Sequence, residues 1–316
     1  MHPDLILAAG ASSPAIADAV ASAIRLTTPL LLAALGAVFT ERGGVVNIGL
    51  EGMMIFGAFW SAWGAYTYGP LAGLAIGAVA GAIMSLVHAI VSVTFRVDQI
   101  VSGVAINTLA YGLVRVASQA LFHSATTSPS VPSLTRIDVP LLDRIPALQP
   151  LMANLSPLIV FAFALVPVSW WVLNRTVFGL RLRSVGENPL AADTLGINVA
   201  LMRYAGVLIS GLLAGLAGGY LAVEQTSMYV EGMTAGRGFV ALAAMIFGNW
   251  TPVGAMLASL LFGLADSLSI RVTIPHVPYQ FVNSLPYILT IVVLAGAVGH
   301  ARAPAADGVP YERSGE

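Results

Sequence analysis

The stretch RTVFGLRLRSVGENPLAADTLGINVALMR, Arg175 to Arg203, is the one long polar segment of a very apolar chain and divides it into a longer and a shorter hydrophobic half. Its basic residues outnumber its acidic ones, with Arg175, Arg181, Arg183 and Arg203 against Glu187 and Asp193. An excess of basic residues in a connecting segment is typical of the cytoplasmic side of a membrane protein. We therefore expect segment 175–203 to lie in the cytoplasm and to set the orientation of the chain.

The composition predicts an all-α, polytopic transmembrane bundle. Of 316 residues, 57% are hydrophobic and 9% are charged, whereas roughly a quarter of residues are charged in soluble domains. A chain of this length holds eight or nine helices of ~20 residues each. We therefore expect one transmembrane domain over residues 1–316, with no room for a separate catalytic domain.

Eight apolar runs are long enough to cross a bilayer. They are Ala15–Phe39, Ile48–Tyr68, Leu71–Phe95, Ile100–Phe122, Pro157–Leu173, Tyr204–Val223, Val253–Val272 and Val282–Val298. A ninth run, Phe239–Trp250, is short and favours a half-helix or a re-entrant segment surrounded by protein or a wet cavity.

The orientation follows by counting from segment 175–203. It places the N-terminus and the proline-rich connection 123–156 outside the cell. We expect the C-terminal tail, residues 300–316, to lie inside, because the short run would cross; the tail would lie outside if that run is re-entrant. Because the first 15 residues lack a basic n-region, we expect the first apolar helix to be retained as a span.

The sequence also predicts an inverted repeat. Met54-Ile55-Phe56-Gly57 recurs as Met245-Ile246-Phe247-Gly248, and an Arg-Gly pair precedes each copy. The predicted orientation makes the two copies run in opposite directions, as in many transporters. The first repeat would cover about residues 15–122 and the second about 204–299, while chance identity in an Ala- and Gly-rich chain is the alternative.

The central polar segment has the signals of a short helical hairpin. Asn188 is a candidate N-cap with Pro189 at the first helical position, and Gly196 is a candidate stop. A helix this short is marginal in water, so it needs something to pack against. Leu190, Leu195 and Ile197 would form an apolar knob that suits docking to another protein; an ordinary loop folded back on its own bundle is the alternative.

Polar residues within the apolar runs are candidates to line a translocation pathway. Asn47 and Glu51 lie among glycines between two runs, and intramembrane ionisable residues usually face the bundle interior or a wet cavity. Gln99 and Asn107 are eight residues apart and share a helical face; Asn249 beside the short run completes the set. The alternatives are that Glu51 forms a structural interhelical contact and that Asn107 bonds a neighbouring helix.

Several chemistries have no signal in the sequence. It contains no GxxxxGK[ST] phosphate loop, so the chain has no ATP site of that kind. The five His residues are scattered and Cys is absent, so no metal-ligand spacing is recognisable. The net charge of -1 gives no indication of a nucleic-acid partner.

Three blocks carry a resemblance to a known family: FGLRLRSVGENPLAADTLGINV (Phe178–Val199), ERGGVVNIGLEGMMIFGAF (Glu41–Phe59) and GRGFVALAAMIFGNWTPVGA (Gly236–Ala255). The chain resembles, from about Arg25 to Gly299, the membrane permease subunits of ABC importers for branched-chain amino acids, simple sugars and nucleosides. The blocks look most like the nucleoside-uptake branch, whose permeases work in unlike pairs.

The resemblance implies a multi-pass permease of the bacterial inner membrane that couples transport to a separate cytoplasmic ATPase. The partners it implies are that ATPase, a second, non-identical permease and an extracytoplasmic solute-binding protein, besides membrane lipid. The chain itself would bind no cofactor, since ATP and magnesium would be used by the ATPase. The implied coupling residues are Arg181, Arg183, Gly186, Glu187, Asn188, Pro189, Ala191, Ala192, Asp193, Gly196 and Ile197.

Three other readings stay open at this stage. The chain could be a simple-sugar or branched-chain amino-acid permease of the same group. It could be an ion-coupled secondary transporter that uses buried Glu51 and Asp266 as proton carriers. An intramembrane enzyme is the third, although no paired catalytic motif supports it.

Overall fold

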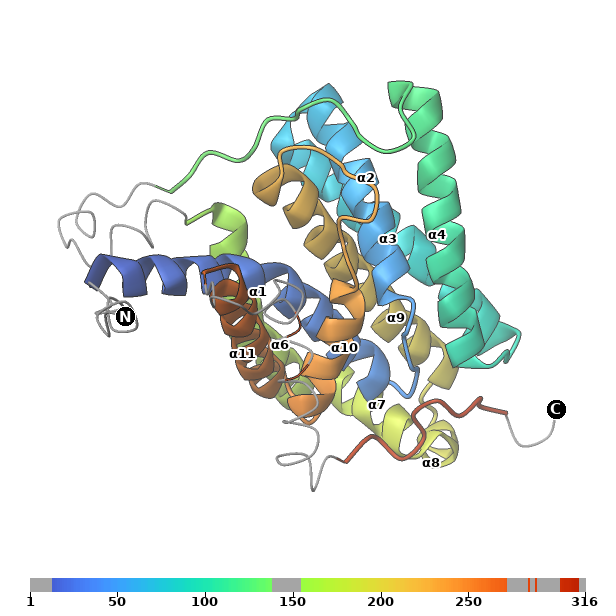
Figure 1. Cartoon of the computed structure of the whole chain (residues 1–316). Helices are drawn as coiled ribbons and strands as arrows, with labels where there is room; N and C mark the ends of the chain where they lie inside the picture. The colour runs from blue at the N-terminus through green and yellow to red at the C-terminus, as the bar shows by residue number, and fades with distance from the viewer. Residues whose placement is uncertain (1–12, 138–154, 272–283, 285–287, 289–301, 313–316) are drawn as a thin grey trace.

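A computed structural model describes residues 13–137, 155–271, 284, 288 and 302–312 of the chain. Within these residues all regular structure is helical, apart from one isolated antiparallel bridge between Thr127 and Val230. The predicted all-α helical bundle is confirmed (Figure 1).

The helices follow one another with short connections, except between α4 and α6. They are α1 (Ser13–Arg42), α2 (Leu50–Tyr68), α3 (Pro70–Ala89), α4 (Gln99–Phe122), α6 (Pro157–Arg175), α7 (Val177–Glu187), α8 (Pro189–Thr194), α9 (Val199–Gly219), α10 (Arg237–Phe247) and α11 (Pro252–Arg271). π-Helical turns extend α3 over Ile90–Thr94 and α9 over Tyr220–Gln225.

The predicted number of crossings is too high for the part of the chain that the structure describes. Six of its helices are long and apolar enough to span a membrane: α1, α3, α4, α6, α9 and α11. Helix α2 falls short because Glu51 and four Trp or Tyr residues lower its mean hydropathy. The short run forms α10, with only 11 residues, and the predicted span Val282–Val298 lies almost wholly outside the described residues.

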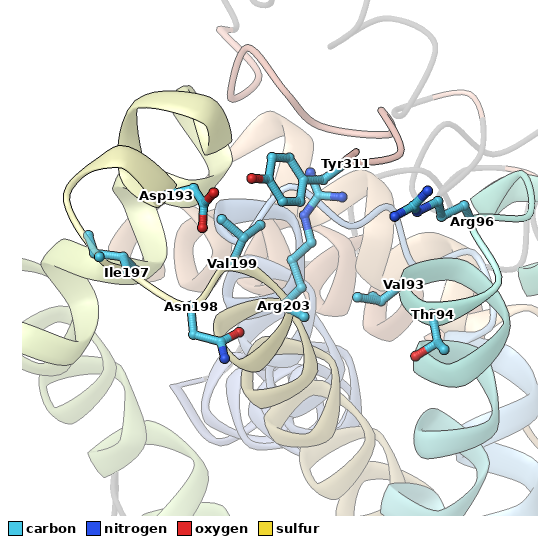
Figure 2. A pocket seen from close by; sticks show the side chains of 11 residues that line it. Val93, Thr94, Arg96, Asp193, Ile197, Asn198, Val199, Arg203 and Tyr311 are labelled. Carbon is cyan, nitrogen blue, oxygen red and sulfur yellow. The ribbon is translucent and has the colours of Figure 1, made fainter. Parts of the chain in front are cut away.

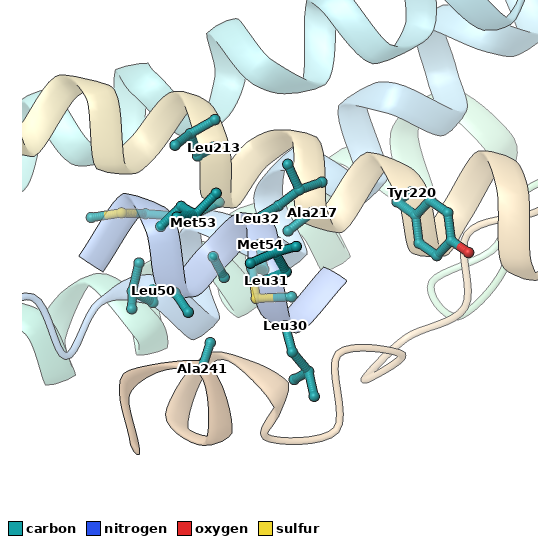
Figure 3. Close-up of a cluster of buried hydrophobic side chains, with 14 of the residues drawn as sticks. Leu30, Leu31, Leu32, Leu50, Met53, Met54, Leu213, Ala217, Tyr220 and Ala241 are labelled. Atoms are coloured by element: carbon teal, nitrogen blue, oxygen red, sulfur yellow. The ribbon is translucent and has the colours of Figure 1, made fainter. Parts of the chain in front are cut away.

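Helix α2 nevertheless lies at the centre of the bundle. Figure 3 shows buried side chains from α1, α2, α9 and α10 meeting around Met53 and Met54. Both methionines are fully buried, as are Leu31 and Leu32 of α1. Close packing of this kind holds membrane helices together, because lipid is as apolar as the side chains themselves.

Glycines let α2, α3 and α9 approach one another, and in α3 and α9 they recur at four-residue spacing. A Cβ on Gly57 of α2 would lie only 2.6 Å from the carbonyl oxygen of Gly215 in α9. Gly81 of α3 is in similarly close contact with Gly211 and Gly215. The glycine faces of α3 and α9 are therefore packing surfaces in this structure.

The bundle has two different ends. Helices α7 and α8 and the described tail residues 302–312 lie at one, which we call the hairpin end (Figure 1). At the opposite end, residues 123–137 run without a helix along segment 226–236, with Ser128 N donating to Tyr229 O at 3.0 Å. An inverted repeat stays a prediction: Met54–Gly57 lies early in α2, whereas Met245–Phe247 ends α10.

Candidate functional site

The central polar segment forms a helical hairpin, α7 and α8, which we call the coupling hairpin. Thr176 caps α7 by accepting from Gly179 N at 3.1 Å. Asn188 caps α8 by accepting from Ala191 N at 3.0 Å, with Pro189 at the first position. Gly196 turns the chain with a φ of 78°, and Asn198 caps α9. The predicted cap Asn188 and the predicted stop Gly196 are confirmed.

One side of the coupling hairpin is fixed to the bundle. Val185, Ala192 and Val199 form a small buried cluster that joins α7, α8 and α9. Gly186 lies so close to the carbonyl group of Arg42 that a Cβ would clash with it. The hairpin therefore contacts α1 at the residue where that helix ends.

The other side of the hairpin faces away from the bundle. Leu190 and Leu195 are 52% and 81% exposed, so they form most of the predicted apolar knob. Ile197, its third predicted member, is half-buried and packs against the Val185 cluster. Leu190 and Leu195 are thus two exposed apolar side chains on an otherwise polar surface.

The predicted coupling residues divide between these two sides. Those that are exposed are Arg181, Glu187, Asn188, Ala191 and Gly196; those that are half-buried are Arg183, Pro189, Asp193 and Ile197; those that are buried are Gly186 and Ala192. Gly186 and Ala192 cannot touch a docked protein directly. They hold the hairpin in place.

A recess of about 490 Å³ opens beside the hairpin. Figure 2 shows Asp193 and Ile197 on one of its sides, Val93, Thr94 and Arg96 on the other, and Arg203 and Tyr311 between them. Since the recess has polar and charged walls and adjoins the exposed leucines, it enlarges the surface that a partner could contact.

The second candidate region is the stretch 43–52, made of the irregular connection 43–49 between α1 and α2 and the first residues of α2, and we call it the buried polar segment. Asn47 is fully buried and its Nδ2 donates to Ser210 Oγ at 3.1 Å. Gln99 is 1% exposed and its Oε1 accepts from Val46 N at 2.7 Å. Non-helical backbone at membrane depth requires such partners, because lipid offers none.

Asn107 bonds the same segment through both the oxygen and the nitrogen of its side-chain amide. Its Oδ1 accepts from Gly52 N at 2.7 Å, and its Nδ2 donates to Ile48 O at 3.0 Å. The prediction that this amide needs a partner is confirmed. Gln99 and Asn107 thus use one face of α4 to hold the chain where α2 begins.

Glu51 accepts hydrogen bonds from the start of α10. Its Oε1 accepts from Thr234 Oγ1 at 2.5 Å and from Gly236 N at 2.9 Å, and its Oε2 accepts from Gly238 N at 2.7 Å. Tyr111 of α4 also donates to it, at 3.2 Å. A carboxylate at a helix N-terminus satisfies unpaired N–H groups and complements the helix dipole.

The five predicted pathway residues do not form one group. Asn47, Glu51, Gln99 and Asn107 all meet at the buried polar segment. Asn249 lies apart, in the exposed turn between α10 and α11 with a φ of 52°. The partners observed for Glu51 and Asn107 are those of the structural alternative, and Asn47 and Gln99 also bond protein groups. A pathway role for these four residues stays a prediction.

Sequence reasoning missed three residues that complete this region. Tyr111 and Thr234 bind Glu51. His88 is fully buried between Ser102 Oγ at 2.9 Å and the Val46 carbonyl at 3.1 Å. Tyr111 follows Asn107 by four residues on the same helical face, so its position was readable; nothing local marks Thr234. Within the described residues, no three His, Asp or Glu side chains lie together as metal ligands.

Comparison with known proteins identifies relatives over nearly the whole chain. The family described as branched-chain amino acid transport system, permease component, matches residues 19–298. The guanosine ABC transporter permease protein NupQ of Bacillus subtilis is 46% identical over 295 residues, 90% of this chain and 92% of NupQ. The nucleoside ABC transporter permease protein NupC of Lactococcus lactis is 43% identical over 309 residues, 93% of this chain and 96% of NupC.

A more distant relative is NupP, also named a guanosine ABC transporter permease protein of Bacillus subtilis. It is 28% identical over 295 residues, 89% of this chain and 82% of NupP. No solved structure matches the chain.

Proposed function

This chain belongs to the branched-chain amino acid transport system permease family, and we propose that it is the membrane-spanning subunit of a bacterial ABC importer for nucleosides. The similarity to NupQ and NupC supports this proposal most strongly, because it extends over at least 90% of the chain. Both relatives are named for guanosine or nucleosides. Like them, the chain is a multi-pass transport component.

The coupling hairpin is the surface on which the cytoplasmic ATPase would act. Leu190 and Leu195 are exposed on the side of the hairpin that faces away from the bundle. The sequence carries no phosphate loop of its own. ATP and magnesium would therefore be bound by the partner. This side of the molecule would face the cytoplasm of the cell, with the permease in the inner membrane.

The structure offers a short route from the hairpin to the middle of the bundle. Gly186 of α7 touches the end of α1 at Arg42, and the buried polar segment begins at the next residue. A movement of the hairpin would displace the end of α1 and with it residues 43–52. In this mechanism Asn47, Glu51, Gln99 and Asn107 lie where access to the two sides would change.

Two further partners complete the proposal. Bacillus subtilis has two related guanosine permeases, NupQ and NupP, which supports an unlike second permease here. A solute-binding protein would deliver substrate at the opposite end. Glu224 and Glu231 lie half-buried at that end, and Glu224 accepts from Leu134 N at 2.8 Å.

The test is uptake by the complete complex in proteoliposomes. The permease would be reconstituted with its ATPase, its second permease and its binding protein, and radiolabelled guanosine uptake measured with excess unlabelled nucleosides, sugars or branched-chain amino acids as competitors. We expect ATP-dependent uptake that only nucleosides compete. Competition by sugars or amino acids instead would reassign the substrate. Uptake abolished by dissipating the proton gradient while ATP is maintained would indicate a secondary transporter.

A further inference from the structure

Residues 302–312 form a non-helical strap across the hairpin end of the bundle, with a turn over residues 305–308, and we call it the C-terminal strap. Figure 1 shows it running past α7 and α8. It lies beyond residues 19–298, where the family match ends. The function proposed above leaves its contacts unexplained.

The strap is hydrogen-bonded to the coupling hairpin. Ala306 N donates to Gly186 O at 2.9 Å, and Ala305 N donates to Glu187 Oε2 at 3.4 Å. Gly186 is in the last turn of α7, where carbonyl groups have no partner within the helix. Tyr311 packs against the cluster of Val185, Ala192 and Val199. The strap thus binds the hairpin on its bundle side and leaves Leu195 exposed.

The strap is also bonded to two other elements. Arg302 N donates to Asn249 Oδ1 at 3.0 Å, in the turn between α10 and α11. Arg203 Nη1 of α9 donates to Val309 O at 3.0 Å. Arg203 is only 1% exposed, and a buried guanidinium is costly without hydrogen-bond partners.

A carboxyl pair lies where the centre of the strap meets α1. The buried side chains of Asp307 and Glu41 are close enough for each to affect the pKa of the other. Glu41 Oε2 also accepts from Trp250 Nε1 at 2.6 Å. Burial raises the pKa of Asp307 to about 7, against the lowering influence of Glu41 and of Arg203. Asp307 is therefore neutral below about pH 7 and carries a negative charge above it.

We propose that Asp307 and the C-terminal strap are positioning elements of the transport cycle, which hold the coupling hairpin, the end of α1, α9 and the α10–α11 turn together so that they move as one unit. The strap contacts the face of the hairpin opposite Leu195, so it can remain bound while a partner docks. Without it, packing contacts such as that of Gly186 with Arg42 would join the hairpin to α1, and less of the hairpin's movement would reach α1. The inference rests on the coupling role of the hairpin proposed above.

The first test removes the strap from the full complex by ending the chain after Ala301. We expect ATP hydrolysis to continue while guanosine uptake per ATP hydrolysed falls by about fivefold or more, the lower end of typical coupling between sites. Glu312→Gln is the matched control, because Glu312 forms only an exposed pair with Arg96 at 3.9 Å, which contributes little. A truncated chain with wild-type uptake per ATP overturns the proposal.

The second test separates positioning from simple stability. Asp307→Asn keeps a neutral donor toward Glu41, whereas Asp307→Ala removes it. We expect Asp307→Ala to lower uptake per ATP at every pH. The ratio of wild type to Asp307→Asn should fall as pH rises through about 7, since only the wild type gains a buried negative charge there. The charged groups facing this site are Glu41 and Arg203, with Arg42 and Glu187 close by. Equal behaviour of wild type, Asp307→Ala and Asp307→Asn across pH would contradict the role of the pair.

A readout without substrate keeps the two proposals distinguishable. If the wild-type complex transports no nucleoside, the proposed substrate fails, but amide hydrogen exchange of α7 and α8 still tests the strap. Exchange there should be about tenfold faster in the truncated chain, as expected for local opening, with α2 and α3 unchanged. Unchanged exchange in α7 and α8 would overturn the proposal on its own.

Discussion

The coupling hairpin and the buried polar segment contain most of the polar residues that the sequence analysis singles out. Most of these residues are exposed or half-buried in the hairpin, whereas they are buried in the segment. In the hairpin, Arg181 and Glu187 are exposed, and polar side chains mainly cap short helices. In the buried segment, Asn47 and Glu51 are at most 3% exposed and bond to other helices. Polar residues in an apolar chain therefore indicate one of two features. One is a surface for a partner, and the other is non-helical backbone buried inside the bundle.

The largest effect is expected at the buried segment, from Glu51→Ala. Two buried backbone N–H groups and the Thr234 hydroxyl would lose their acceptor. At about 1–3 kcal/mol for each unsatisfied group, the free energy of unfolding should fall by about 3 kcal/mol or more. Thermal unfolding of the purified permease, followed by Trp fluorescence, measures this.

Glu51→Gln is the control, since it keeps the shape and one acceptor oxygen, and we expect a smaller loss. If both variants unfold like the wild type but transport differently, Glu51 is a pathway residue and the contrast between the two regions breaks down.

A smaller effect is expected on the bundle side of the hairpin, from Ala192→Leu. Ala192 is 2% exposed against Val185 and Val199, so a larger side chain overpacks the cluster at a cost of about 1–3 kcal/mol. The hairpin should be displaced and uptake per ATP reduced. Its neighbour Ala191 is exposed, and Ala191→Leu should leave stability unchanged in the same assay. Equal loss in both variants would show that α8 is not fixed as the structure has it.

On the side of the hairpin that faces away from the bundle, Leu195→Asp should weaken binding of the ATPase without unfolding the permease. Leu195 is 81% exposed, so its loss costs the isolated chain nothing, whereas a buried charge at an interface costs the complex about tenfold in affinity or more. The affinity of the permease for the ATPase is measured by pull-down of the ATPase with salt-washed permease. Leu195→Met should bind normally. Unaltered binding of Leu195→Asp would place the docking surface elsewhere.

The smallest effect is expected from Asn188→Ala, which removes the cap of α8. Caps of this kind contribute about 1 kcal/mol, and Asn188 Oδ1 accepts only from Ala191 N. We expect faster amide exchange in α8 alone, with little change in the unfolding temperature. Asn188→Asp should restore the cap. A global loss of stability would mean that the hairpin is part of the folding core.

Local signals made the hairpin readable from the sequence. Asn188, Pro189 and Gly196 fix where α8 begins and ends, and each acts within a few residues. The cost of an unpaired amide likewise predicted that Asn107 has a partner. That partner, the backbone of residues 48 and 52, depends on the packing of α4 against α2 and could not be read from one helix.

The features that could not be predicted from the sequence depend on contacts between residues that are far apart in it. The bonds from Glu51 to α10 join residues more than 180 positions apart, so no periodicity shows them. Asn249 resembled the other pathway candidates in type but lies in an exposed turn. The C-terminal strap contains neither an apolar run nor a motif, and its role depends on the surfaces that it crosses. Helix α2 is central although its composition is the least typical of a span.

Thiol labelling in this Cys-free chain compares the two regions in one measurement. Leu195→Cys and Asn47→Cys would each be reacted with a small polar thiol reagent, in the permease alone and in the complex with its ATPase. We predict that Leu195→Cys reacts rapidly alone and at least about tenfold more slowly in the complex, as a docking contact should. Asn47→Cys should react slowly without nucleotide, and faster during ATP turnover if the segment lines the pathway. Equal labelling of Leu195→Cys with and without the ATPase would contradict the central claim that the hairpin is the coupling surface.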